Sequence, residues 1–193
     1  MRPLDPIKHE KIIKAVFTVT GSHGLAGINI AAISNAAGVG TGTLYTYFRN
    51  KEEVIQSAYS SVEDKMTQKM YEHFDIQIPV KQSLKKIYVN MLNYRLNHYN
   101  ETIFIDQYIQ SNYIQLNFSK QMAEFEHQNK PLYDLLKKGQ DEGIIKVQPP
   151  IVLISFFDGA VRSCSNGIVQ KLFPLTQQII DDCFDFVWKG VTQ

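Results

Sequence analysis

The feature that most constrains the fold is a pair of short helical segments separated by a glycine turn. Residues 29–37 read Asn-Ile-Ala-Ala-Ile-Ser-Asn-Ala-Ala, and residues 41–47 read Thr-Gly-Thr-Leu-Tyr-Thr-Tyr. The intervening Gly38-Val39-Gly40 breaks the helical pattern. Two short helices joined by such a turn are typical of a helix-turn-helix unit. Because helices of this length are marginal in water on their own, the pair requires a third helix to pack against.

The segment before the pair provides that third helix. Asp5 followed by Pro6 is typical of an N-cap with proline at the first helical position. The apolar residues that follow recur at helical spacing, namely Ile12, Ile13, Val16 and Phe17. Gly21 and Gly24 are expected to end this helix. The sequence therefore predicts a three-helix DNA-binding head over residues 1–50.

The second short helix divides into an inward and an outward face. At about 100° per residue, Leu44 and Phe48 lie close together and point inward. The opposite arc carries no charge and consists of Gly42, Thr43, Tyr45 and Thr46, with Tyr47 at its border. Threonine and tyrosine hydroxyls can bind base edges or phosphates, and glycine allows a close backbone approach. This pattern indicates a surface that contacts DNA.

A longer motif surrounds the two helices. The run INIAAISNAAGVGTGTLYTYFRNKEEV at 28–54 strongly resembles the DNA-binding signature of the TetR/AcrR family of transcriptional regulators. The matching positions are Ile33, Ala37-Gly38-Val39, Gly42-Thr43-Leu44-Tyr45, Tyr47-Phe48 and Lys51-Glu52. Because the spacing is fixed over the whole run, the match is specific. The rest of the chain resembles the family in architecture, including its closing Phe186-Val187-Trp188-Lys189-Gly190.

The resemblance implies that residues 41–47 form the recognition helix. It places Thr43, Tyr45, Tyr47 and Lys51 at DNA-contacting positions, and Asn29 where the family often has a capping threonine that touches phosphate. With the outward face added, the predicted DNA-binding residues are Asn29, Thr41, Gly42, Thr43, Tyr45, Thr46, Tyr47 and Lys51. Two positions depart from the pattern. Gly40 replaces the serine or threonine usual at the cap of the recognition helix, with Thr41 as an alternative cap, and Ser34 replaces a usual alanine.

Charge is distributed unevenly along the chain. Residues 1–51 contain six Lys and Arg against two Asp and Glu, whereas residues 52–193 contain fourteen against seventeen. A basic N-terminal quarter on an acidic body fits a local polyanion site, and chance scatter is the alternative interpretation.

Residues 51–193 are predicted to form a helical ligand-binding and dimerisation body. Helices are expected at about 50–74, 79–99, 102–110, 117–141, 149–170 and 176–190, with Pro131 kinking or dividing the fourth of these. No convincing alternating pattern predicts a sheet. The expected fold is all-α, with about nine helices in total.

The middle of the body is rich in aromatic residues. Most of them are expected in the core, but a cavity between helices lined by aromatics with a few polar tips is the functional alternative. The resemblance favours this cavity, because family members generally carry an inducer pocket in the body. The candidate lining residues are Tyr88, Met91, Arg95, Tyr108, Phe125 and Phe157. Arg95 on an apolar face requires a partner, either an acid of the protein or an acid group of a ligand, and a place at the surface is the alternative.

The last two helices, at about 149–190, carry more apolar side chains than one packing stripe needs. We expect them to form a homodimer interface, because two operator half-sites require two heads at a fixed spacing. Packing within one subunit is the alternative. Cys164 and Cys183 fall on these helices, and we interpret them as small buried hydrophobes in preference to a redox switch.

Several other functions find no support in the sequence. The five histidines are dispersed and form no zinc motif, and Thr43 stands where a dinucleotide loop would need its third glycine. No nucleophile motif or carboxylate pair indicates an enzyme, so no cofactor, metal or catalytic residue is expected. There is no signal peptide or stretch long enough to span a membrane, and two cysteines fit a reducing cytosol. We expect a cytoplasmic protein with no membrane partner.

These observations predict a transcriptional regulator that binds double-stranded operator DNA. Its expected form is a homodimeric repressor released from a palindromic operator by a small-molecule ligand. The alternative is a DNA-bound adaptor whose body binds a protein partner, which an exposed apolar patch in place of an enclosed cavity would favour.

Overall fold

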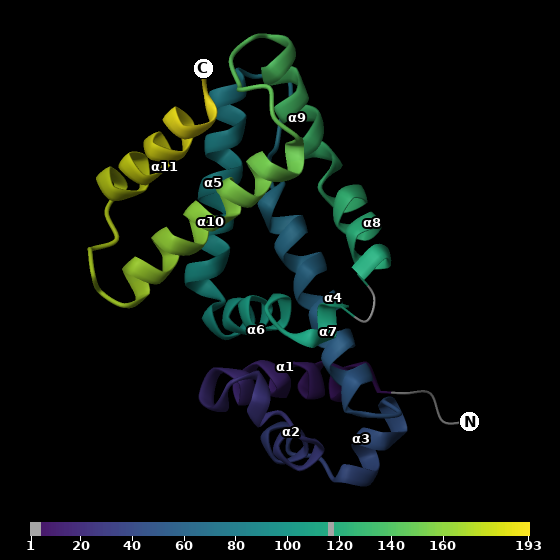
Figure 1. The fold of residues 1–193 in the computed structure, drawn as a ribbon. Coiled ribbons are helices and arrows are strands. Elements are labelled where there is room, and N and C mark those ends of the chain that lie inside the picture. Colours follow the sequence, from purple (N-terminus) through teal and green to yellow (C-terminus); the bar gives the residue numbers. More distant parts are fainter. Residues whose placement is uncertain (1–4, 116–117) are drawn as a thin grey trace. The chain divides into compact units, whose positions relative to one another are not determined.

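The protein is all-helical in the computed structural model, which describes residues 5–115 and 118–193 (Figure 1). The only strand-like pairing among the described residues is one isolated antiparallel bridge between Ile145 and Thr192. The predicted all-α class is therefore confirmed. No helix in the described ranges has the length and apolar character needed to span a bilayer.

The described residues form eleven α-helices and one short 3-10 helix, η1. In chain order they are α1 Pro6–His23, η1 Leu25–Gly27, α2 Ile30–Ala37, α3 Thr41–Tyr47, α4 Lys51–Met70, α5 Val80–Asn97, α6 Tyr99–Ile109, α7 Asn112–Gln115, α8 Phe118–Gln128, α9 Lys130–Asp141, α10 Pro150–Val169 and α11 Gln177–Val191.

The helices pack into two compact units. Unit 1 comprises Met1–Lys65 and His98–Gln121, and unit 2 comprises Met66–Asn97 and Met122–Gln193. The predicted head of residues 1–50 therefore packs together with the first part of α4 and with α6. The predicted functional boundary between residues 50 and 51 stays a prediction.

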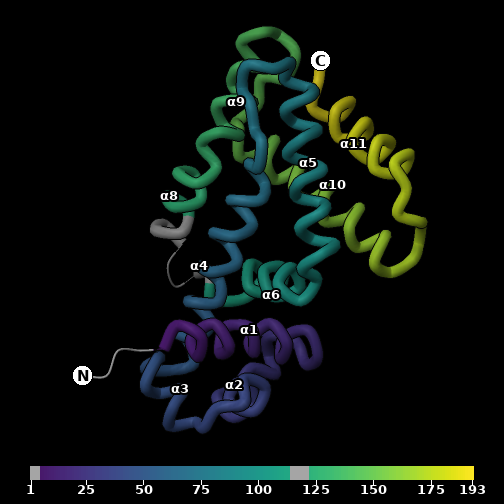
Figure 2. Tube along the Cα trace, turned by 180° about the vertical axis from the view of Figure 1, so that it is seen from behind, coloured from purple at the N-terminus to yellow at the C-terminus, as the bar shows by residue number. Residues whose placement is uncertain are grey.

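Unit 1 is built around α1, which contacts α2, η1 and α6 (Figure 2). Its core joins the head to the first half of α4 and to α6 through side chains that include Ile12, Val16, Ile33, Leu44, Phe48, Ile55 and Phe104. Gly21 lies where α1 meets α6, and a Cβ at this position would come within 2.6 Å of the side-chain oxygen of Asn100. Gly21 therefore permits the close approach and does not end α1, contrary to our expectation. The helix ends at Gly24, whose φ is +69°.

Unit 2 is built around α5, which contacts α9, α10 and α11. Its core is formed mainly by these four helices and includes Leu84, Tyr88, Leu135, Val161, Phe184 and Val187. Two lysines of α5 reach α11: Lys81 pairs with Asp185 at 3.1 Å, and Lys85 pairs with Asp181 at 2.7 Å. Lys85 lowers the pKa of the Asp181 carboxyl.

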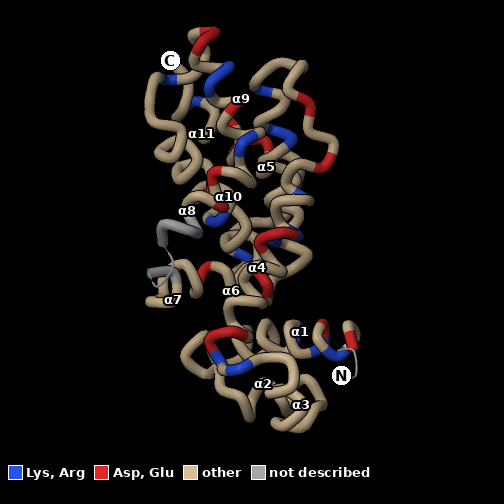
Figure 3. Tube along the Cα trace, turned by 90° about the vertical axis from the view of Figure 1, so that its right-hand side faces the viewer, with Lys and Arg blue, Asp and Glu red and all other residues tan. Residues whose placement is uncertain are grey.

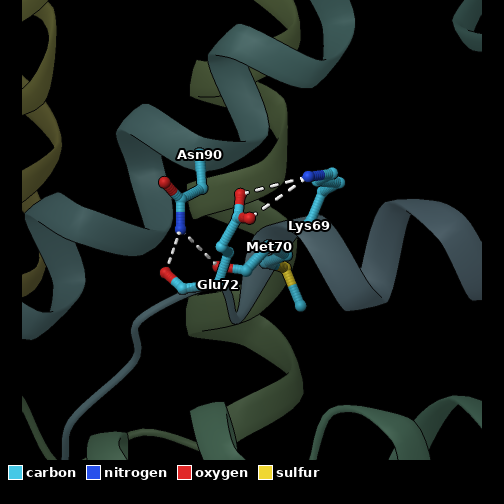
Figure 4. A network of polar contacts seen from close by, with 4 residues as sticks. All are labelled: Lys69, Met70, Glu72 and Asn90. Carbon is cyan, nitrogen blue, oxygen red and sulfur yellow. Dashed lines mark hydrogen bonds and ion pairs between the residues drawn. The ribbon is translucent and has the colours of Figure 1, made fainter.

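The α4 helix ends at Met70, one turn earlier than expected, because a side chain of α5 caps it. The Asn90 amide donates hydrogen bonds to the backbone oxygens of Met70 at 3.1 Å and Glu72 at 2.9 Å (Figure 4). Lys69 closes the same turn by pairing with the Glu72 carboxylate at 3.2 Å. The two Asn90 bonds satisfy backbone carbonyl groups at and just after the end of the helix, where intrahelical partners are missing.

Other helix bounds follow the expected pattern with local differences. The helix expected at 102–110 is α6, which begins three residues earlier, at Tyr99. The single turn of α7, which lies between the helices expected at 102–110 and 117–141, was not predicted. Residue 117, the expected start of the next helix, lies outside the described residues. Pro131 divides that segment, because it falls in the first turn of α9, where proline leaves no hydrogen bond unmade. The bounds of α10 and α11 agree with the prediction to within one residue.

Candidate DNA-binding surface

The α3 helix presents one face to the core of unit 1 and the other to solvent. Leu44 is 0% exposed and Phe48 is 4% exposed, whereas Tyr45 is 55% exposed. Thr41, Gly42 and Thr46 are also exposed, and Thr43 and Tyr47 are half-buried. The predicted division between inward and outward residues is confirmed. The outward arc is therefore open to solvent, fully at Thr41, Gly42, Tyr45 and Thr46 and partly at Thr43 and Tyr47.

The start of α3 lacks a side-chain cap. Gly40 occupies the N-cap position and makes no side-chain hydrogen bond, and Thr41 is the first helical residue. Thr41 therefore does not take over the cap. A Cβ at either Gly40 or Gly42 would meet no atom within 4 Å, so this end of the helix has an open backbone.

The hydroxyl groups of this surface differ in the hydrogen bonds that they already make within the protein. Thr46 donates a hydrogen bond to the backbone oxygen of Gly42 at 3.1 Å, within the same helix. Tyr47 is tied to the segment before α1, since its hydroxyl accepts from the Asp5 backbone N–H at 3.0 Å and donates to the Asp5 oxygen at 3.3 Å. Sequence reasoning missed this structural tie, because no local pattern pairs residues 42 positions apart. Direct contact of Tyr47 with DNA stays a prediction.

The α2 helix begins as predicted at the Asn29 cap. The Asn29 side chain accepts a hydrogen bond from the Ala32 N–H at 2.9 Å and donates one to the Gly27 oxygen at 3.3 Å. At the other end, Gly38 adopts the left-handed conformation with φ of +65°, as the turn of the motif requires. The cap thus fixes where α2 begins, and phosphate contact by Asn29 stays a prediction.

Lys51 opens α4 beside a network of capping bonds. The Glu53 N–H donates to the Asn50 side chain at 2.8 Å, and the Glu53 carboxylate accepts from the Arg49 N–H at 2.6 Å. Asn50 thus caps the helix that was expected to begin at about residue 50. Lys51 is half-buried at the first position of the helix, where backbone N–H groups and its own charge favour an anion.

The helix-turn-helix itself carries no charge. No Lys, Arg, Asp or Glu occurs between residues 24 and 48, and cations flank this stretch at Lys8, Lys11, Arg49 and Lys51 (Figure 3). Lys14 is paired with Glu10 at 2.7 Å. Arg2, one of the basic residues counted in the sequence, lies outside the described residues. Attraction to a polyanion therefore comes from the borders of this surface and not from its centre.

Side chains of α6 hold the head in place through contacts within unit 1. The Gln107 side-chain oxygen accepts a hydrogen bond from the Leu25 N–H at 2.6 Å. Tyr108 is fully buried, stacks on Tyr59 with ring centroids 4.2 Å apart, and donates to the Gln56 oxygen at 2.8 Å. These positioning residues lie far from the motif in sequence, and no spacing signal could have found them.

The residues proposed to line a ligand pocket are not all brought together. Tyr88, Met91 and Phe157 lie in the core of unit 2, and Phe125 packs against it. The buried Arg95 donates through Nε to the Ser165 hydroxyl at 2.8 Å, also within unit 2. Tyr108 belongs to the other core, that of unit 1. Their binding of a ligand stays a prediction.

The face formed by α10 and α11 exposes large apolar side chains. Val152 and Phe156 of α10 are 52% and 53% exposed, and Phe186 of α11 is 70% exposed. A Cβ on Gly190 would come within 2.9 Å of the Phe156 ring, so this ring lies over α11. Phe186 and Gly190 are four residues apart and share a helix face. These side chains form one apolar patch, which we call the α10–α11 patch.

Two short helices are joined here by a glycine turn, the second is exposed and uncharged, and cations flank it. This arrangement is that of a helix-turn-helix DNA-binding protein. The family described as bacterial regulatory proteins, tetR family, matches residues 12–58, and the tetracyclin repressor-like C-terminal domain matches residues 59–193. The chain belongs to the TetR family. It is a DNA-binding transcription regulator, and membership in this family of regulators sets it apart from enzymes.

Individual relatives agree with this assignment. An uncharacterised helix-turn-helix-type transcriptional regulator of Bacillus subtilis, YhgD, is 26% identical over 87 residues, which are 45% of this chain and 46% of the relative. The fatty acid metabolism regulator protein of B. subtilis is 30% identical over 77 residues, or 40% of each chain. The matched segments thus span less than half of these curated relatives. The crystal structure of a TetR family regulator from Marinobacter aquaeolei VT8 shares the fold, with a TM-score of 0.90, 21% identity and full coverage of both chains.

Proposed function

We propose that the protein is a homodimeric repressor that binds a palindromic operator and is released from it by a small molecule. The observation that carries the DNA part is the outward face of α3, where Tyr45 is exposed beside the open backbone at Gly42. Each protomer would place this helix in a major groove, and two successive grooves lie about 34–36 Å apart.

The proposal of a homodimer is supported by the α10–α11 patch. Contiguous exposed apolar surface of this kind is unusual on a monomer and marks an interaction site. A second copy of the chain is the occupant that we propose, because a two-fold operator requires a two-fold protein. A different protein partner on this patch would correspond to the adaptor function.

The ligand part of the proposal rests on the family and on the aromatic core of unit 2, with Tyr88, Met91 and Phe157 as its lining residues. A ligand that favours a released conformation about 10⁴-fold would move occupancy from 1:99 to 99:1. A thermal-shift screen with a broad apolar library tests this part. If no compound stabilised the protein, release by a small molecule would be dropped.

In-vitro selection from a random duplex pool tests the DNA part, and the selected site is then titrated across salt. We expect a palindromic site whose affinity falls with salt. Tyr45→Ala should weaken binding to that site by about 1–3 kcal/mol.

Lys51→Ala should weaken binding to all sequences alike and reduce the salt slope by about one. A changed sequence preference in the Lys51 variant would contradict its phosphate role.

A further inference from the structure

Tyr88 is a fully buried polar residue whose hydroxyl has no hydrogen-bond partner in the described structure. Its exposed fraction is 0%. The ring is held by α10 and α11, since its centroid lies 6.0 Å from that of Phe157 and 5.5 Å from that of Phe184. By distance and angle its oxygen makes no hydrogen bond to the described residues, although the thiols of Cys164 and Cys183 lie next to it. The ring packing would be the same for phenylalanine, so packing alone does not account for the hydroxyl.

Several other buried polar side chains of unit 2 do find partners, whereas the Tyr133 hydroxyl finds none among the described residues. Arg95 donates to Ser165, and Ser165 donates to the Arg162 backbone oxygen at 2.9 Å. Asn129 donates to the Phe125 oxygen at 2.8 Å. A buried hydroxyl without a partner is costly and therefore requires an explanation.

The groups next to the Tyr88 hydroxyl are the thiols of two cysteines. Burial raises its pKa most, and the neighbouring thiols of Cys164 and Cys183 raise it further. Thiols are weak hydrogen-bonding groups, so a stronger acceptor or donor would displace them as neighbours. Met91 lies one turn away on the same helix in the same core, and methionine adapts its shape readily.

We infer that the Tyr88 hydroxyl is the polar anchor for a predominantly apolar small molecule that carries an uncharged oxygen, such as an ester or ketone carbonyl. This inference rests on the proposed ligand-responsive function and specifies the chemistry of its site. An uncharged oxygen fits because Phe157 and Phe184 pack against the Tyr88 ring and the groups next to its hydroxyl are thiols. A carboxylate buried among them would lose its hydration without gaining a cation from these groups, and the Nε of Arg95, the buried cation of the same helix, already donates to Ser165.

The experiment uses the full chain and its single tryptophan as the reporter. Trp188 stacks on Phe184 with centroids 6.5 Å apart, and Phe184 contacts Tyr88. Three probes share a ten-carbon chain and differ at its end: methyl decanoate, decanoate and decane. We expect methyl decanoate to change Trp188 emission saturably and to bind more tightly than decanoate. Tyr88→Phe should weaken methyl decanoate binding about fivefold, the value of one typical hydrogen bond, and leave decane binding unchanged.

Two controls make the result specific to Tyr88. Tyr133→Phe removes another buried hydroxyl without a hydrogen-bond partner, on α9, and should leave methyl decanoate affinity unchanged. Without probe, Tyr88→Phe should unfold at a higher temperature than the wild type, because it loses an unpaired buried group. If this variant did not fold, NMR of wild-type protein labelled with 13C at the tyrosine Cζ would replace it. The Tyr88 signal should then shift with methyl decanoate and not with decane.

Equal methyl decanoate affinity in the wild type and the Tyr88→Phe variant would overturn the inference, as would no binding of any probe. In the substitute experiment, an unshifted Tyr88 signal would overturn it. Operator binding by the same preparations is measured separately. Operator binding without probe binding would refute this site and leave the DNA-binding function intact. Probe binding that failed to release the operator would instead contradict the proposed repressor mechanism and leave the site intact.

Discussion

Gly42 is the residue at which stability and DNA binding are expected to change in opposite directions. It lies in the first turn of α3, on the exposed face, and a Cβ there would meet no atom within 4 Å. Gly42→Ala should therefore leave the fold intact and stabilise it by up to about 1 kcal/mol, since alanine is the better helix former. If the backbone approaches DNA closely, the added methyl group should lower operator affinity about tenfold or more.

Urea unfolding and operator titration of the Gly42→Ala variant measure the two effects independently. An unchanged operator affinity would mean that the backbone at this position does not come close to DNA. A loss of stability would contradict the open space observed around Gly42.

Ser34 is a second residue whose replacement should stabilise the protein. It is 2% exposed, and its hydroxyl has no hydrogen-bond partner among the described residues. Ser34→Ala removes this unpaired group and should raise the free energy of unfolding by about 1 kcal/mol. Chemical denaturation checks the value. The matched control is Ser83→Ala, because the equally buried Ser83 donates to the Asp75 oxygen at 2.7 Å and its loss should be destabilising.

The prediction of individual site residues from the sequence succeeded where local periodicity decided the outcome. Leu44 and Phe48 are buried and Tyr45 is exposed, as helical spacing requires. It failed for contacts between distant segments. The hydrogen bonds between Tyr47 and Asp5 and from Leu25 to Gln107 depend on tertiary packing. Residue spacing along the chain does not predict which distant residues will meet.

At the scale of single elements, the cap that ends α10 is fully bonded but has a lysine, Lys171, in the left-handed position that favours glycine. Lys171 has φ of +58°, and its N–H donates to the Ile168 oxygen while the Leu172 N–H donates to the Gly167 oxygen. This bonding is the Schellman pattern, in which glycine normally takes the left-handed position. Lys171→Gly should stabilise the protein by about 1 kcal/mol, because the Cβ strain disappears.

The natural comparison for this cap is Gly143, which ends α9 with the same bonding and φ of +69°. Gly143→Ala should destabilise the protein by about the same amount that Lys171→Gly stabilises it. Thermal unfolding of both variants measures the difference. Shifts of the same sign would show that left-handed strain does not govern these two ends.

Element bounds were predictable where a cap or a proline stood in the sequence. Asp5 and Asn29 each cap the helix that follows, as expected, and Thr176 caps α11, which begins within one residue of its predicted start. The end of α4 was misplaced because its cap comes from Asn90 on another helix. The short α7 has no sequence signal of its own.

At the scale of the whole molecule, the α10–α11 patch decides the oligomeric state if the proposed homodimer is correct. Phe186 is its most exposed member, at 70%. Burying a phenylalanine side chain is worth about 1.5–3 kcal/mol, and a carboxylate in the same place would have to be buried without a partner. Phe186→Asp should therefore convert the dimer to a monomer at micromolar concentration while leaving the fold intact, because the side chain is exposed in one chain.

Sedimentation velocity and operator titration together test this consequence. The monomer should bind the palindromic operator far more weakly than the wild type, because each half-site then loses the benefit of the linked second head. Val147→Asp is the matched control, since Val147 is 78% exposed but lies between α9 and α10, outside both helices of the patch. It should leave the dimer and the operator affinity unchanged. A Phe186→Asp variant that remained dimeric would place the interface elsewhere and free the patch for another protein partner.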